Sequence, residues 1–92
     1  MINSKSHDAK EITGAQIRAA RALIRWSAKD LAKRAGVGVA TVSRAEIEDG
    51  TTSLTGANVT AIRSALESGG VEFIPENGSG AGVRLKKQAS EG

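Results

Sequence analysis

The side chains that most often carry out chemistry in proteins are few in this sequence and poorly arranged for catalysis. The chain has no cysteine, and its one histidine, His7, has no second histidine with which to form a metal site. Ser27 and Ser43 have no adjacent base that would activate a serine nucleophile. The run GSGAG at 78–82 lacks the Lys-Ser/Thr pair and the following helix of a phosphate-binding loop. We therefore expect no enzyme activity, no metal and no cofactor.

The basic side chains, in contrast, gather in one part of the chain. Between residues 14 and 46, seven basic residues stand against two acidic ones, a net charge of +5. Residues 47–82 hold one arginine against five acidic residues, a net charge of −4. The seven basic residues are Arg18, Arg21, Arg25, Lys29, Lys33, Arg34 and Arg44. This asymmetry favours a surface that faces a polyanion, although a solvated basic face would have the same composition.

Two helices are expected in this basic part of the chain. Thr13 is a suitable N-cap for a helix that runs to about Arg25. Ser27 is placed to start a second helix, with Asp30 returning the hydrogen bond as in a capping box. Gly36 can adopt the left-handed conformation that ends such a helix.

Two further helices follow. The third covers about residues 39–46, a loop rich in turn-forming residues occupies 48–56, and the fourth runs to about Ser68. Apolar residues recur at helical spacing in the first, second and fourth helices and should face the core. They are Ile17, Ala20, Ile24, Leu31, Ala32, Ala35, Val59, Ile62 and Leu66.

The sequence then changes to the alternating pattern of strands. VEFI and VRLK, separated by a glycine-rich loop, predict a β-hairpin at 71–86. The alternation places Val71, Phe73, Val83 and Leu85 on one face. We expect this face, or an open strand edge, to join two copies of the chain into a homodimer. Residues 1–11 and 87–92 are predicted to be flexible tails, which leaves 12–70 as a helical domain.

The second and third helices are too short to be stable alone, so shared core residues must hold them together. Leu31, Ala35 and Val42 are placed to do so, and Gly36 permits the sharp turn between them, which is the arrangement of a helix-turn-helix. The run IRAARALIRWSAKDLAKRAGVGVATVSRAE resembles the Cro and phage-repressor (xenobiotic-response-element) family of DNA-binding proteins, and the resemblance extends over residues 17–66. It implies a mainly α fold, a four-helix repressor-like domain followed here by the hairpin, where the family core usually ends in a fifth helix.

The resemblance also implies which residues meet DNA, because the third helix of such proteins enters the major groove N-terminus first. Arg44 is the main candidate for reading a base, whereas Val39 and Ala40 can make only apolar contacts, for example with thymine methyl groups. Ala28 stands where the family commonly has a phosphate-binding glutamine, so hydrogen-bond readout should be sparse. The implied DNA-binding residues are Lys29, Lys33, Gly38, Val39, Ala40, Thr41, Ser43, Arg44, Thr51 and Thr52.

Two other residue assignments complete the prediction. The family pattern pairs Arg21 with Glu46, and we expect a structural ion pair that ties the first helix to the third. Trp26 could stack on a base, but its place at a helix end favours a lid on the core.

Together these features predict a sequence-specific DNA-binding transcriptional regulator. A small dimeric repressor or autoregulator, acting by occupying a two-fold operator on double-stranded DNA, fits the short chain best. The alternative is a protein-interaction module, such as an antitoxin or anti-activator, that uses the same fold to hold a protein partner. No apolar run is long enough to cross a membrane, and the first residues lack a signal-peptide core, so a cytoplasmic protein is expected.

Overall fold

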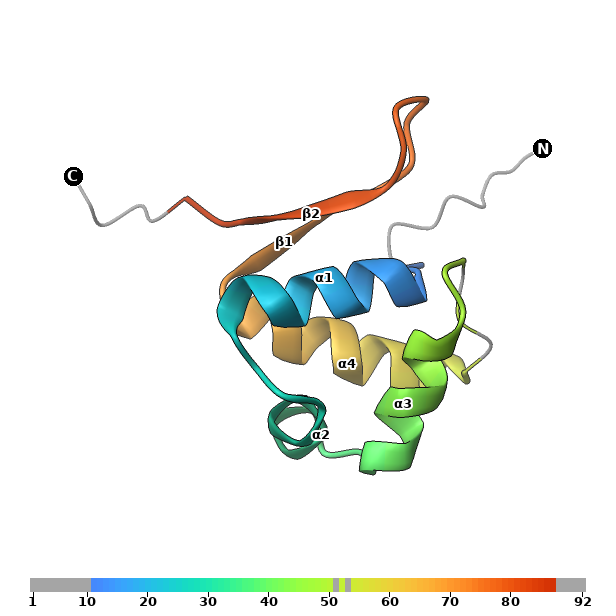
Figure 1. Cartoon of the computed structure of the whole chain (residues 1–92), viewed down its shortest axis with the longest axis vertical. Helices are drawn as coiled ribbons and strands as arrows, with labels where there is room; N and C mark the ends of the chain where they lie inside the picture. The colour runs from blue at the N-terminus through green and yellow to red at the C-terminus, as the bar shows by residue number, and fades with distance from the viewer. Residues whose placement is uncertain (1–10, 51, 53, 88–92) are drawn as a thin grey trace.

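Four helices and a two-stranded antiparallel hairpin make up the described part of the chain (Figure 1). The structure is a computed structural model and describes residues 11–50, 52 and 54–87. The helices are α1 (Gly14–Ile24), α2 (Ala28–Ala35), α3 (Val39–Ile47) and α4 (Gly56–Ser68), and the strands are β1 (Val71–Ile74) and β2 (Gly82–Leu85). The predicted mainly α fold class is confirmed. Within the described residues, none of the helices has the length and apolar character needed to cross a membrane.

The starts of α1 and α2 lie at the predicted N-caps Thr13 and Ser27, and local hydrogen bonds set both. The Thr13 hydroxyl accepts a bond from the Gln16 backbone N–H at 3.0 Å, and the Gln16 side chain accepts one from the Thr13 N–H at 2.9 Å. Ser27 and Asp30 form the same reciprocal pair at the start of α2. Such an N-cap contributes about 1 kcal/mol to helix stability. The predicted end of α2 is confirmed as well, since Gly36 has a φ of 73°.

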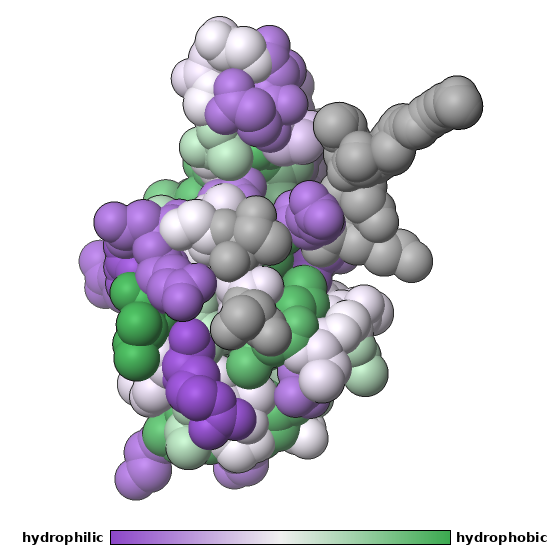
Figure 2. All heavy atoms as spheres, turned by 90° about the vertical axis from the view of Figure 1, so that its right-hand side faces the viewer, coloured by the Kyte–Doolittle hydropathy of each residue, from purple (hydrophilic) through white to green (hydrophobic). Residues whose placement is uncertain are grey.

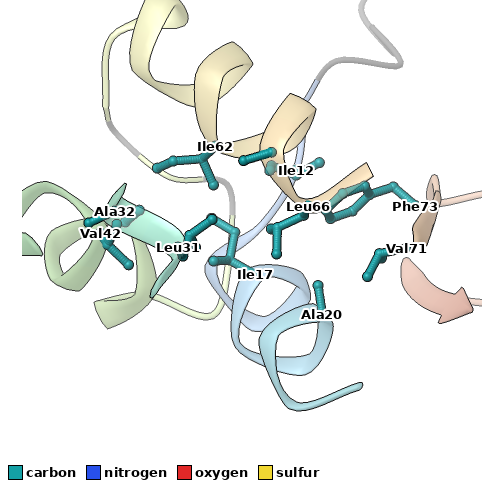
Figure 3. Close-up of a cluster of buried hydrophobic side chains, with 12 residues drawn as sticks. Ile12, Ile17, Ala20, Leu31, Ala32, Val42, Ile62, Leu66, Val71 and Phe73 are labelled. Atoms are coloured by element: carbon teal, nitrogen blue, oxygen red, sulfur yellow. The ribbon is translucent and has the colours of Figure 1, made fainter. Parts of the chain in front are cut away.

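The core is aliphatic and takes residues from all four helices (Figure 3). Its larger fully buried side chains from α1 to α4 are five in number. They are Ile17, Leu31, Val42, Ile62 and Leu66. Full burial of each such side chain contributes about 1.5–3 kcal/mol, so these contacts fix the angles between helices that are individually too short to persist. Trp26 is half-buried and packs against this core, which agrees with the predicted lid.

The hairpin packs on the helices and belongs to the same core. In the register, Val71 lies opposite Leu85 and Phe73 lies opposite Val83. Val71 is 0% exposed and Phe73 is 7% exposed, and Val83 packs against the same cluster. The face predicted to join two copies is therefore largely covered by the chain's own helices. The physical reason is that a two-stranded ribbon is marginal in water and needs an apolar face to pack on. Of the four predicted residues, Leu85 alone is mainly exposed, at 55%.

A buried amide fixes the hairpin to α1. Gln16 is 4% exposed, and its Nε2 donates to the carbonyl oxygens of Ile74 at 3.2 Å and of Gly82 at 2.9 Å. These two residues are paired at the loop end of the ladder. The Gln16 amide therefore supplies a hydrogen bond to two backbone carbonyl groups of the hairpin, both more than fifty residues away in the sequence.

Candidate nucleic-acid interface

The connection between α2 and α3 is a tight turn that keeps the two helices in contact. The N–H groups of Gly36 and Val37 both donate to the carbonyl oxygen of Ala32, at 2.9 and 3.0 Å. Leu31 and Ala32 on α2 and Val42 on α3 are buried in the shared core. Because α3 is packed through one side only, its other side faces outward.

We define the outer face of α3 as its five exposed residues, which are Val39, Ala40, Ser43, Arg44 and Ile47. At about 100° per residue, these positions share one arc of the helix. Val42 and Ala45 occupy the opposite arc and have no exposed surface. Arg44 carries the face's only charge, and no acidic side chain belongs to it. Figure 2 looks onto the side of the molecule that carries α3, where hydrophobic patches lie among hydrophilic side chains.

The N-terminus of α3 lacks a side-chain cap. Its N-cap is Gly38, and no side chain bonds to the first-turn amides, whereas Thr13, Ser27 and Thr55 cap the other three helices. The Gly38 position also has no close neighbour, since an added Cβ would meet only the Thr41 hydroxyl at 3.9 Å. The first turn of α3 is therefore open to a molecule that approaches from outside.

The preceding helix α2 carries exposed basic side chains. Lys29 and Lys33 are exposed, as predicted for residues that reach phosphates. Arg34 is also exposed, but its guanidinium lies over the Trp26 ring, 4.8 Å from the ring centre. Asp30, the acidic residue of α2, is engaged with the helix start. The carboxylate of Asp30 forms hydrogen bonds with Ser27. The bond with the Ser27 backbone N–H has the larger effect and the bond with the Ser27 hydroxyl the smaller, and both hold the pKa of Asp30 below its usual range.

An ion pair holds the C-terminal half of α3 against α1. The Nε and Nη2 atoms of Arg21 donate to the two carboxylate oxygens of Glu46, at 2.6 and 2.9 Å. The Nη1 of Arg21 donates to the Trp26 carbonyl at 3.0 Å. The side chains of Arg21 and Glu46 are 23% and 11% exposed, and the hydrogen bond with Glu46 raises the pKa of Arg21. The predicted pair is thus present, and it turns the Glu46 carboxylate away from the outer face.

Two further residues of α1 hold α3 and were not predicted from the sequence. Arg18 donates from Nη1 to the Glu46 carbonyl and from Nη2 to the Asp49 carboxylate, both at 2.6 Å. The Gly14 N–H donates to the Gly50 carbonyl at 3.0 Å. The spacing of Gly14, Arg18 and Arg21 places them on one face of α1, which is the signal that could have identified them. We call these three residues the α1 clamp.

The remaining predicted DNA contacts lie in different settings. Thr41 is half-buried on the flank of α3. Thr52 is 8% exposed, and its hydroxyl accepts a hydrogen bond from the Leu54 N–H at 3.3 Å. The predicted contact of Thr52 with a phosphate is therefore not supported, because its loop folds this side chain inward. Thr51 lies outside the described residues.

No group of three or more His, Cys, Asp or Glu side chains that could hold a metal ion occurs within residues 11–50, 52 and 54–87.

The comparisons with known proteins agree with the geometry of α2 and α3. A family model described as helix-turn-helix, of the Cro/C1 type, matches residues 17–73. This range contains α2, α3 and α4 in full, most of α1 and most of β1. A search of curated proteins found no match.

Proposed function

Because the chain belongs to the Cro/C1 type of helix-turn-helix family, a family of DNA-binding regulators, we propose that it is a sequence-specific transcriptional regulator. Its mode of action would be that of a small dimeric repressor or autoregulator, which occupies a two-fold operator in the cytoplasm and blocks access to it. No catalytic step forms part of this proposal.

The observation that carries the proposal is the contrast between the two ends of α3. The C-terminal half is held by the α1 clamp, whereas the N-terminal turn has no side-chain cap, exposes Val39 and Ala40, and follows a helix with exposed Lys29 and Lys33. The acidic residues Glu48 and Asp49 follow the C-terminus of α3, and Asp49 is paired with Arg18 of the clamp. This charge distribution favours entry into the major groove N-terminus first, since the anionic end then stays away from the phosphates.

A duplex-binding titration at two salt concentrations tests the proposal. A site selected from a random duplex pool is labelled, and its Kd is measured by fluorescence anisotropy at about 50 and 200 mM salt. Affinity should fall steeply with salt, because each neutralised phosphate contributes about −0.9 to the slope of log K against log salt. Val39→Asp should abolish binding while the fold survives, since Val39 is exposed and a carboxylate there meets the phosphate potential.

Arg44 and Lys33 provide a matched pair of variants. If Arg44 reads a base, Arg44→Ala should weaken the selected site by about 1–3 kcal/mol and weaken unrelated DNA much less. If Lys33 touches a phosphate, Lys33→Ala should weaken all sequences alike and reduce the salt slope by about 1. A folded Val39→Asp protein with the parent's affinity would contradict the proposal.

One observation favours the alternative, a protein-interaction module such as an antitoxin or anti-activator. Ile47, in the last turn of α3, is 74% exposed, the largest exposure among the large hydrophobic residues described. An exposed aliphatic side chain of this kind suits a protein surface. If duplex binding is weak and independent of sequence at both salt concentrations, this second function takes precedence.

A further inference from the structure

The first turn of α3 offers almost no hydrogen-bonding side chain to a DNA base. Its exposed residues are Val39, which is 42% exposed, and Ala40, after the N-cap Gly38, which has no side chain, and its remaining residue, Thr41, is half-buried. Polar groups on the outer face occur only further along, at Ser43 and Arg44. Base edges are usually read by amide, guanidinium or carboxylate groups, so the leading part of this helix must discriminate bases by other means.

An aliphatic side chain has one good partner in the major groove, which is the C5 methyl group of thymine. The amino and carbonyl groups on the other base edges would lose water against Val39 without gaining a hydrogen bond, and this loss is unfavourable. The first turn of α3 therefore attracts a methyl group and disfavours an unmethylated polar edge at the same place.

The charges around the first turn favour DNA as the occupant of this apolar surface. Lys29 and Lys33 on the preceding helix α2 are exposed, and so is Arg44 further along α3. The nearby carboxylates are engaged, that of Glu46 by Arg21 and that of Asp30 by the Ser27 N–H at 2.9 Å. An apolar first turn on a pair of helices whose exposed side chains are mainly basic complements thymine methyl groups between two phosphate backbones.

We propose that Val39 and Ala40 read the C5 methyl groups of thymines, so that the preferred DNA has thymine at the positions under the first turn of α3. This inference rests on the proposed function and names the chemical feature of the DNA that the same surface recognises. The guanidinium of Arg44 would supply hydrogen-bond readout at a separate position.

Deoxyuridine provides a direct test, because it pairs as thymidine does and lacks only the C5 methyl group. A duplex enriched by the full chain from a random thymidine-containing pool is resynthesised with deoxyuridine at one thymidine at a time, and each Kd is measured. At one or two positions, affinity should fall about three- to tenfold, the effect of losing one or two buried methyl contacts.

Two variants assign the effect to residues. In Val39→Ala, which shortens an exposed side chain and leaves the core intact, the deoxyuridine penalty should shrink at one position. In Arg44→Ala, overall affinity should fall and the penalty should remain. Two outcomes would overturn this inference and leave the proposed function standing. In the first, the enriched duplex tolerates deoxyuridine at every position. In the second, the deoxyuridine penalty is the same in Val39→Ala and in Ala40→Gly as in the parent protein. If no duplex binds at either salt concentration, the proposed function fails and this inference fails with it.

Discussion

At the scale of single residues, the Arg21–Glu46 pair shows how a charged contact can orient α3. Both side chains are mostly buried, and Arg21 also satisfies the Trp26 carbonyl. Removing one partner leaves the other charge in a site that excludes much of the water. We expect Arg21→Ala and Glu46→Ala each to lower the free energy of unfolding by roughly 2–4 kcal/mol, toward the lower end of the range for buried pairs. Urea unfolding followed by circular dichroism measures both.

The surface pair of Arg84 and Glu72 serves as the control. Its side chains are 62% and 45% exposed at an Nε–Oε1 distance of 3.1 Å. Exposed pairs contribute little because solvent screens them, so Arg84→Ala should have a far smaller effect. Equal effects of Arg21→Ala and Arg84→Ala would show that the inner pair has no special structural role.

The sequence identified part of this residue-scale picture. At about 100° per residue, Val42 and Arg44 lie about 200° apart in any helix, so the two sides of α3 were predictable. Thr52 was not, because its loop has no periodic pattern that would distinguish an inward hydroxyl from an outward one. Arg18 and Gln16 were not predicted either, since their partners lie 28 to 66 residues away in the sequence.

At the scale of elements, the approach of α1 to α3 depends on a glycine. A Cβ added at Gly14 would lie 1.9 Å from the Glu48 carbonyl oxygen and 2.7 Å from the Ala45 carbonyl oxygen. Both atoms are backbone, so Gly14→Ala requires the whole end of α3 to move. We expect Gly14→Ala to lower the free energy of unfolding by about 1–3 kcal/mol or more, as overpacking does in other cores.

Gly56 offers a matched control for this prediction. Like Gly14, it is the first residue of a helix and follows a threonine N-cap, but no atom of the described residues lies within 4 Å of its added Cβ. Gly56→Ala should be neutral or should stabilise the protein by up to about 1 kcal/mol, because alanine has less freedom to lose on folding. Similar stability changes in the two variants would show that Gly14 is not a packing requirement.

Element boundaries were predictable because their signals are local. Thr13, Ser27 and Gly36 act within four residues of their own positions, and the structure has them where the sequence indicates. The hairpin shows the limit of such signals. Alternation predicts that Val71 and Phe73 share a face, but it does not say whether a second copy or the chain's own α1 and α4 covers that face.

At the scale of the whole molecule, the hairpin is expected to be required for folding. Phe73 is 7% exposed in the common core, and the Arg63 guanidinium lies 5.2 Å from its ring centre. Phe73→Ala should destabilise the protein by about 3–5 kcal/mol, the usual cost of such a truncation in a core. Leu85→Ala, on the exposed part of the same face, should cost far less. If thermal melts show Phe73→Ala as stable as Leu85→Ala, the hairpin is not part of the core.

The outer edge of β2 is one place where the hairpin can still join two copies. The Lys86 N–H donates to the Gly70 carbonyl at 2.8 Å, so the alternation of the ladder turns the backbone groups of Val83 and Leu85 outward. Among the described residues, no backbone bond outside the helices and strands reaches these groups. A second copy could pair antiparallel about Arg84, with Val83 opposite Leu85 of the other copy.

We therefore predict a homodimer that forms through this edge. Sedimentation should show a concentration-dependent equilibrium between one and two copies, shifted toward the dimer by operator DNA, because a two-fold site binds two copies together. Leu85→Pro removes one outward N–H while sparing the inward bonds of the ladder, a position where an edge strand tolerates proline. This variant should remain folded and stay monomeric in the absence of DNA. A parent protein that is monomeric at all concentrations, with and without DNA, would rule out the dimer. Dimerisation of Leu85→Pro at the parent's strength would instead place the interface elsewhere on the molecule.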